Sequence, residues 1–212
     1  MERSIEQISH KARLRLVGVA MSVVCALLVV GVSIILFAPI HQGHKLLAAI
    51  AHLRVGNSDF SETGRVAQSM GFQTEDDTPC TAQNCIWKIA KDNGYYPSFW
   101  RGQKTTLSIV LTVESNRLVQ ISVDFGRGQL ARDPKVDVFE QVPELWKMRS
   151  TTEVSSGFDE TTGRTVTAVV RVAPSASAAD RERYLGLDLS CFSRYRGCSH
   201  VHEFLPSLSD HN

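Results

Sequence analysis

The chain lacks a net charge of either sign. Its 212 residues carry 23 Lys and Arg against 22 Asp and Glu, which gives a formal net charge of +1. The balance is uneven, because residues 1–15 hold a surplus of +2 and the remainder therefore sums to −1. A region so close to neutrality has no basic face that could neutralise a phosphate backbone. The sequence thus predicts no nucleic-acid partner.

The motifs of common catalytic and cofactor sites are also missing. The chain contains no P-loop, no G-x-G-x-x-G and no G-x-S-x-G, and beyond residue 56 it has no S-x-x-K. Beyond the same residue, histidine occurs only as His200, His202 and His211, so a nucleophile would have few bases to activate it. The acidic run at residues 75–77 is typical of a solvated polar loop. The sequence predicts no catalytic residue and no cofactor.

Charge is absent altogether from Leu16 to Ile40, a run of 25 residues in which only Ser22 and Ser33 are plainly polar. A helix rises about 1.5 Å per residue, so about 20 apolar residues cross the hydrocarbon core of a bilayer. A helix also satisfies its own backbone hydrogen bonds in lipid, whereas a buried core helix rarely stays apolar on every face for this length. The run predicts a transmembrane helix at 16–40 that leaves the membrane at Pro39.

We expect this run to be an uncleaved signal anchor. The apolar part of a cleaved signal peptide has about 7–15 residues and a small-residue cleavage site, but this run is longer and ends in FAPI. The basic residues before it are Arg3, Lys11, Arg13 and Arg15, and those soon after it are Lys45 and Arg54. The positive-inside bias predicts a cytoplasmic segment at 1–15 and an extracytoplasmic, periplasmic chain from about residue 41, anchored in the cell membrane by one span.

Small residues recur at every fourth position within the run, at Gly18, Ser22 and Ala26. Such a face lets a second helix approach closely, so it predicts a homodimer through these three residues. Cys25 lies in the same run and is interpreted as a small apolar residue.

Four cysteines lie beyond the run, in the pairs Cys80/Cys85 and Cys191/Cys198. Their spacings, C-x4-C and C-x6-C, differ from the C-x-x-C of redox couples and fall at or outside the range of zinc sites. Disulfides persist outside the cytoplasm. We therefore predict two structural disulfides, Cys80–Cys85 and Cys191–Cys198, although the sequence leaves the crossed pairings open.

Residues 41–56 are rich in Ala and Leu and predict a juxtamembrane helix, either a stalk or a continuation of the span, that ends at Gly56. The remainder, 57–212, is predicted to be an extracytoplasmic α+β domain. Its first helix is expected at 59–70, capped by Asn57 or Ser58 and closed by Gly71.

Alternating apolar residues then predict an antiparallel sheet packed on helices, with one covered face. The expected strands are 105–115, 117–126 and 164–173, with a turn at 114–117 and a shorter edge strand at 85–90. The segments 134–146 and 155–164 are left as connections.

A C-terminal helix is predicted from Ser177, which with Asp180 loosely matches a capping box. Its buried stripe would be Tyr184, Leu185, Leu189 and Phe192. Arg194 and Arg196 would suit its negative end, and Gly197 would follow it. The alternating LGLDL leaves a strand within 181–196 as an open alternative.

Two groups of side chains stand out as sites. A possible binding loop holds Tyr95, Tyr96, Phe99 and Trp100, which could grip a partner or a membrane interface or could cap the core of the sheet. His200 and His202 would share a face on a strand and could share a metal. Since no third ligand is evident, no metal site is predicted.

Two family resemblances rest on these motifs. The basic start, the span, the C-x4-C-x-W motif, the sheet and the Gly-Cys at 197–198 with Leu205-Pro206 after it resemble uncharacterised single-anchor envelope proteins of acidobacteria. The segment LRVGNSDFSETGRVAQSMGF at 53–72 is similar to a helix opening in small outer-membrane assembly lipoproteins and β-lactamase-inhibitor-like domains. The second resemblance implies an α+β binding module.

The sequence therefore favours a single-pass, membrane-anchored envelope protein that binds an envelope partner and catalyses nothing. The alternative is an envelope hydrolase or metal-dependent enzyme that uses His200 and His202. A histidine in a cleft beside a carboxylate would favour the alternative.

Overall fold

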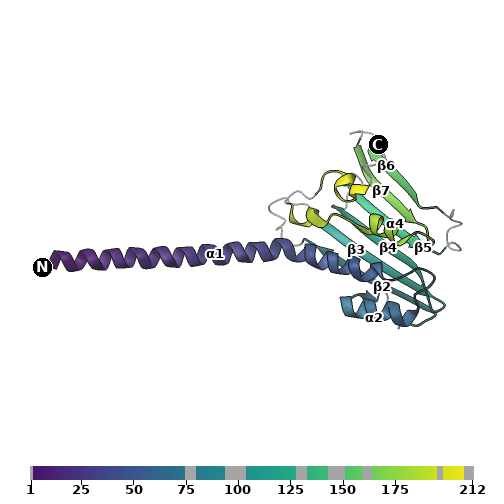
Figure 1. Cartoon of the computed structure of the whole chain (residues 1–212), viewed down its shortest axis with the longest axis horizontal. Helices are drawn as coiled ribbons and strands as arrows, with labels where there is room; N and C mark the ends of the chain where they lie inside the picture. Colours follow the sequence, from purple (N-terminus) through teal and green to yellow (C-terminus); the bar gives the residue numbers. More distant parts are fainter. Residues whose placement is uncertain are drawn as a thin grey trace. The chain divides into compact units, whose positions relative to one another are not determined.

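The computed structural model describes residues 2–74, 80–93, 104–127, 133–142, 151–159, 164–194 and 198–207. The chain forms two compact units, Met1–Ala38 and Pro39–Asn212. Figure 1 shows the helices and strands in chain order. The binding loop at Tyr95, Tyr96, Phe99 and Trp100 lies outside the described residues, as do residues 75–77, Arg196, Gly197 and His211.

The first helix, α1, runs without interruption through Glu2–Ala51. Within the described residues its segment Val17–Ala51 is the one helix long and apolar enough to cross a membrane, with a mean hydropathy of 2.9 in its most apolar window. The large apolar side chains from Val17 to Ile34, together with Phe37, are 51–66% exposed. Such a continuous apolar surface is stable in lipid rather than in water, so this helix indicates membrane anchoring. Pro39 lies inside the helix, so of the two alternatives that the sequence left for residues 41–56, a stalk or a continuation of the span, the structure shows a continuation.

Residues 41–51 continue α1 and belong to the core of the second unit. Leu46, Leu47 and Ile50 are buried there together with Leu53 and Val55 in the next turn. The helix ends at Ala51, five residues before the expected Gly56. Gly56 instead takes a left-handed conformation with φ of 82° in the connection to the next helix, which glycine adopts without a steric penalty.

The second helix, α2 (Phe60–Met70), agrees closely with the predicted 59–70 and ends at Gly71, whose φ is 77°. Its cap is neither Asn57 nor Ser58, because Asp59 Oδ1 accepts the backbone N–H of Glu62 at 2.7 Å. The Ser58 hydroxyl is instead turned back and accepts the N–H of Arg54. The carboxylate of Asp59 is the better partner for the positive end of α2.

The strands form one seven-stranded sheet in the order β1-β2-β3-β4-β5-β7-β6 (Figure 1). Their bounds are β1 (Gln73–Thr74), β2 (Asn84–Asp92), β3 (Thr105–Glu114), β4 (Arg117–Arg127), β5 (Lys135–Gln141), β6 (Glu153–Asp159) and β7 (Arg164–Val172). The predicted hairpin is confirmed, since Ser115 and Asn116 both have positive φ between β3 and β4. Two strands, β5 and β6, come from segments that the sequence left as connections.

Two details of the predicted sheet are wrong. The strand β2 is not the edge strand, because the two residues of β1 pair with it on its outer side. The sheet is also not wholly antiparallel, because β5 and β7 pair in parallel. A parallel pair needs a crossover connection, and here the antiparallel strand β6 lies between β5 and β7 in the chain.

One face of the sheet carries the core. Leu107, Ile109, Leu111 and Val113 of β3 are all fully buried, and the alternate residues of the neighbouring strands join them in one cluster with side chains from α1, α2 and the C-terminal segments. The opposite face of β3 is half-buried from Thr106 to Thr112, and Glu114 at its end is exposed. This alternation is that of an antiparallel sheet with its apolar side chains on one face.

The C-terminal helix is shorter than predicted. Helix α4 (Ala178–Leu185) begins at the expected cap, where Ser177 Oγ accepts the N–H of Asp180. It stops before Gly186, and two short 3-10 helices follow, η2 (Leu189–Ser193) and η3 (Val201–Glu203). The described part of 181–196 contains no strand. Three of the four stripe residues are nonetheless buried, and Tyr184 is half-buried.

Candidate functional site

Both predicted disulfides join their local pairs. Cys80 pairs with Cys85 and Cys191 with Cys198, at Cα–Cα distances of 4.7 Å and 5.1 Å. The Cys80–Cys85 loop also holds the β3–β4 turn, because the carbonyl oxygens of Ala82 and Gln83 accept the N–H groups of the two turn residues. This bridge therefore fixes the hairpin end of the sheet.

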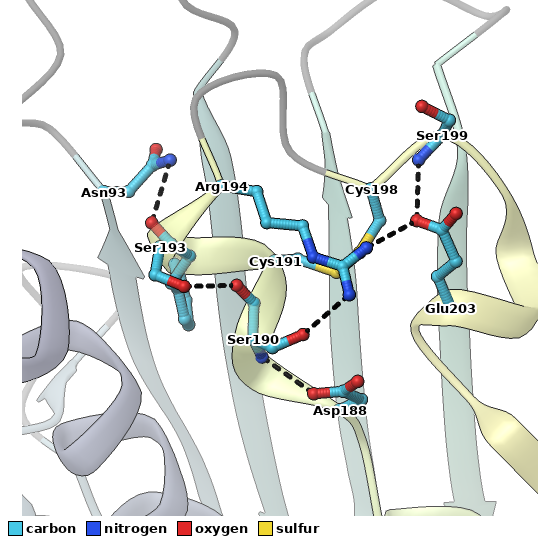
Figure 2. Close-up of a disulfide and its surroundings, with 10 residues drawn as sticks. Asn93, Asp188, Ser190, Cys191, Ser193, Arg194, Cys198, Ser199 and Glu203 are labelled. Atoms are coloured by element: carbon cyan, nitrogen blue, oxygen red, sulfur yellow. Dashed lines mark hydrogen bonds and ion pairs between the residues drawn. A yellow bond between two sulfur atoms is a disulfide. The ribbon is translucent and has the colours of Figure 1, made fainter.

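The second disulfide is fully buried and is enclosed by a polar network (Figure 2). Arg194 donates to Glu203 Oε2 at 3.1 Å and to the hydroxyl of Ser190 at 3.2 Å, and the N–H of Ser199 donates to the same Glu203 oxygen. Arg194 thus ties η2 to η3 rather than serving the end of a long helix, as the sequence predicted. The network closes the two ends of the Cys191–Cys198 loop on each other.

Asn93 connects this region to the base of the predicted aromatic loop. It is buried at the end of β2, its Oδ1 accepts the N–H of Thr105 at 2.8 Å, and its Nδ2 donates to the carbonyl of Phe192 at 3.5 Å. Lys104 forms an ion pair with Asp92 beside it. Asn93 and Thr105, on either side of segment 94–103, are therefore hydrogen-bonded to each other, and Asn93 is also bonded to η2. The four aromatic residues themselves lie outside the described part of the chain.

His200 and His202 do not lie on a strand, because η3 begins between them. Their rings stack on each other with centroids 5.3 Å apart and planes 10° apart. His202 is exposed and His200 is half-buried. Within the described residues no group of three His, Cys, Asp or Glu side chains could hold a metal ion. In that same part of the chain no carboxylate forms a hydrogen bond or ion pair with either imidazole.

The site that the sequence missed is centred on Arg181 of α4. Its Nε and Nη2 donate to Glu140 Oε2 of β5 at 2.9 Å and 2.7 Å, while Nη1 and Nη2 donate to the carbonyl oxygens of Ala51 and Leu53 at 2.9 Å and 2.8 Å. Both charged side chains are almost completely buried, with 3% and 5% of their surface exposed. A helix leaves its last carbonyls without partners, and Arg181 satisfies this end of α1 while neutralising Glu140.

The pKa of Glu140 reflects this position. Burial raises the pKa of the carboxyl above its usual value, and the Arg181 guanidinium opposes that effect. Both guanidinium N–H groups donate to one oxygen of the carboxylate, and the two charges lie in a dry environment, where breaking the pair is costly. Arg181 is therefore a structural connection among α1, α4 and β5.

A groove with a volume of about 610 Å³ lies beside this connection. One wall comes from the last turns of α1 and the residues after it, and the other from α4 and the residues that follow. The lining residues are His44, Leu47, Ala48, Ala51, His52, Arg54, Ala178, Arg181, Glu182, Leu185, Gly186 and Leu187. Half of them are alanine or leucine, and the volume falls within the range typical of small-molecule sites.

The opposite face of the sheet carries a pair of acids. Asp124 of β4 and Asp137 of β5 are directly paired across the two strands. Burial, and then the charge and hydrogen bond of Asp137, raise the pKa of Asp124 to about 6. Lys135 forms an ion pair with Asp137 at 3.5 Å. Two neighbouring carboxyl groups do not both ionise easily, so Asp124 titrates in a mildly acidic range.

Other surfaces are simpler. Among the described residues beyond the apolar run, the exposed large hydrophobic side chains are Val154 and Phe158, both on the edge strand β6. In α1 the Ser22 hydroxyl donates to the carbonyl of Gly18 at 2.9 Å, so it is satisfied within its own helix. The homodimer through Gly18, Ser22 and Ala26 stays a prediction.

The order of features on which the first of the two family resemblances rests is present in the structure: an apolar helix, a first disulfide loop that leads into a strand, a sheet, and a second disulfide loop. The resemblances themselves stay predictions. No protein-family profile matches the chain, and neither the curated proteins nor the solved structures contain a match to it.

Proposed function

We propose that this protein is a single-pass, membrane-anchored binding module whose folded domain, from about residue 41, faces the extracytoplasmic side. The domain binds an envelope component and does not catalyse a reaction. The groove between α1 and α4 is the binding site.

The topology is supported by two features. More basic residues precede the apolar run than follow it closely, which favours a cytoplasmic N-terminus. All four cysteines beyond the run pair with each other, and disulfides form and persist outside the cytoplasm. Cys25, inside the run, is the one free cysteine.

The groove is the observation that carries the binding role. Half of its lining residues are alanine or leucine and five carry polar side chains, a combination that can hold a ligand through shape together with polar contacts. Its one buried charged side chain, Arg181, is already engaged with Glu140 and with the end of α1. That engagement makes the floor of the groove rigid, and a rigid floor lowers the entropy cost of binding.

The topology is tested in spheroplasts of cells that express the full chain with a C-terminal epitope. Added protease should remove the epitope, and a membrane-impermeant maleimide should label the four domain cysteines only after reduction. An epitope that survives while all five thiols react in unreduced lysate would overturn the proposed location.

The binding role is tested by native mass spectrometry of the full-length protein released from mild detergent. The wild type should retain a bound molecule. Ala48→Trp, which places an indole in the groove, should lose it at least tenfold. Gln42→Trp is the matched control, because Gln42 is exposed on the same helix and does not line the groove. Equal retention in Ala48→Trp and wild type, or no bound molecule in either, would contradict a binding role for the groove.

A further inference from the structure

We propose that the groove binds the headgroup and the first carbons of the acyl chains of an anionic phospholipid from the membrane that anchors the chain. This inference rests on the proposed function, since it names the ligand of the same groove. It follows from three properties of the described residues: the apolar floor, the charges at the rim and the short connection to the apolar run.

The floor of the groove is apolar. Leu47, Leu185 and Leu187 are buried side chains that line it, and the exposed Ala48 and Ala51 of α1 leave room above them. A volume of about 610 Å³ corresponds to roughly twenty water molecules at about 30 Å³ each. A free inorganic anion would leave most of this apolar surface in contact with water. A ligand with both a charged group and a hydrocarbon part covers it.

The two walls of the groove differ in charge. The α1 wall carries the positive charge of Arg54 and the imidazoles of His44 and His52, whose N–H groups can donate to a phosphate, whereas the one acid that lines the groove, Glu182, lies on the α4 wall. Arg181 adds no net charge, because Glu140 neutralises it. The α1 wall is also free of opposing charge in sequence, since no Asp or Glu occurs between residues 16 and 58. A phosphate group is therefore attracted to the α1 wall.

The connection to the membrane is short. His44 lies four residues after Ile40, the last residue of the uncharged run. Four residues reach at most about 14 Å even when fully extended, so chain connectivity alone keeps this end of the groove near the lipid headgroups. A tethered site meets its ligand at a high effective concentration, so even a modest intrinsic affinity is enough for the groove to be occupied by lipid.

The test uses the full-length protein in nanodiscs that contain equal amounts of phosphatidylglycerol and phosphatidylcholine. After brief extraction into mild detergent, native mass spectrometry counts each lipid on the protein. We expect phosphatidylglycerol to exceed phosphatidylcholine at least threefold on the wild type. The enrichment should be abolished in Ala48→Trp, which fills the groove, and in the double variant His44→Glu/His52→Glu, which places two carboxylates on its α1 wall.

Lys45→Glu is the matched charge control. Lys45 is exposed beside His44 on α1 but does not line the groove, so this variant should keep at least two thirds of the enrichment. Circular dichroism and the melting temperature of each variant confirm that it folds like the wild type. For a variant that fails this check, His52→Glu alone replaces the double variant.

Three results would overturn the inference. An equal loss in Lys45→Glu would mean that the membrane-proximal charge attracts lipid without the groove. A groove-dependent adduct that is not a phospholipid, or that is phosphatidylcholine as often as phosphatidylglycerol, would refute the ligand class but leave the proposed binding function intact. Displacement of phosphatidylglycerol by millimolar inorganic phosphate would mean that the site recognises phosphate alone.

Discussion

Replacement of Arg181 by methionine tests the central connection of the domain. Methionine keeps the apolar part of the side chain but removes all four hydrogen bonds that the guanidinium donates to Glu140, Ala51 and Leu53. The variant leaves Glu140 buried without its counter-ion. We expect the loss in the free energy of unfolding to depend strongly on pH.

The magnitude follows from the cost of protonating Glu140. Burial already raises its pKa, and without Arg181 the pKa rises further, so the folded variant holds the carboxyl in its neutral form. A carboxyl with a raised pKa in the folded state stabilises the protein fully at low pH and loses that contribution as the pH rises through the folded pKa. The free-energy cost of keeping Glu140 neutral is counted from its ordinary pKa of 4.5. This cost is at most about 4 kcal/mol at about pH 7.5 and about 1.4 kcal/mol at about pH 5.5.

The two lost bonds to α1 carbonyls add about 1 kcal/mol each at any pH. The total loss in Arg181→Met should therefore be at most about 6 kcal/mol near pH 7.5 and at most about 3 kcal/mol near pH 5.5, because the wild type, where the pKa of Glu140 is also raised, already carries part of the cost. The assay is urea unfolding of the full-length protein in detergent, followed by near-ultraviolet circular dichroism at both pH values. The difference from wild type at each pH removes titrations that the two proteins share.

Two further variants make the interpretation specific. Arg181→Met/Glu140→Gln has no buried charge, so its loss should be the same at both pH values. Arg194→Met breaks the partly exposed pair with Glu203 and should cost about 1 kcal/mol or less. A loss in Arg181→Met that does not change between pH 5.5 and 7.5 would refute the claim that Arg181 compensates a buried carboxylate.

Three other changes give separate tests by the same unfolding assay. Asp124→Asn should raise the free energy of unfolding by about 1–2 kcal/mol near pH 7.5, after allowance for partial exposure, and not at all near pH 4. A carboxyl whose folded pKa is raised to about 6, by burial and by Asp137, loses its stabilising contribution as the pH rises from 3.8 to that value. An equal gain at both pH values would show that the ionisation of Asp124 is not the cause. Gly43→Leu should destabilise the domain by about 1–3 kcal/mol despite the better helix propensity of leucine, since even a Cβ there would come within 2.5 Å of a buried leucine side chain. An unchanged midpoint of urea unfolding would mean that α1 does not pack as described. Cys198→Ser should cost about 3–5 kcal/mol and Cys85→Ser about 2–3 kcal/mol, because only the second bridge is fully buried at both ends; the reverse order would contradict this difference.

Local pattern was enough to predict several parts of the fold. The uncharged run, the helix at 60–70 with Gly71 after it, and the β3–β4 hairpin all follow from residues that are close in sequence. The two disulfides were predicted correctly for the same reason, because each joins cysteines that are close in sequence. The aromatic loop at 94–103 remains a prediction, and of that region the structure describes only its base at Asn93 and Thr105.

Features that depend on distant partners were missed. The segment of β5 has the period of a strand, but its parallel partner β7 lies beyond β6 in the chain. No short turn connects β5 to β7, so the local sequence does not indicate that they pair. The end of the C-terminal helix at Leu185 was also missed. The backbone leaves the helix at Gly186, where an added Cβ would come within 2.9 Å of the Glu182 carbonyl oxygen. The buried leucine and phenylalanine that follow reach the core from a 3-10 helix.

The connection through Arg181 could have been anticipated from one signal in the sequence. In KVDVFEQ, Val136 and Val138 point into the core, and Glu140 continues the same alternation. An acid at an inward position must find a buried base or remain neutral, so the strand itself predicts that some Lys or Arg of the domain is buried opposite it. The sequence does not reveal which one, because Arg181 lies in the highly charged ADRERY segment of a short helix, where an exposed arginine is the usual outcome. The end of α1 at Ala51 explains why Arg181 is the buried base. The last carbonyls of that helix require donors close to Glu140, and Arg181 supplies them.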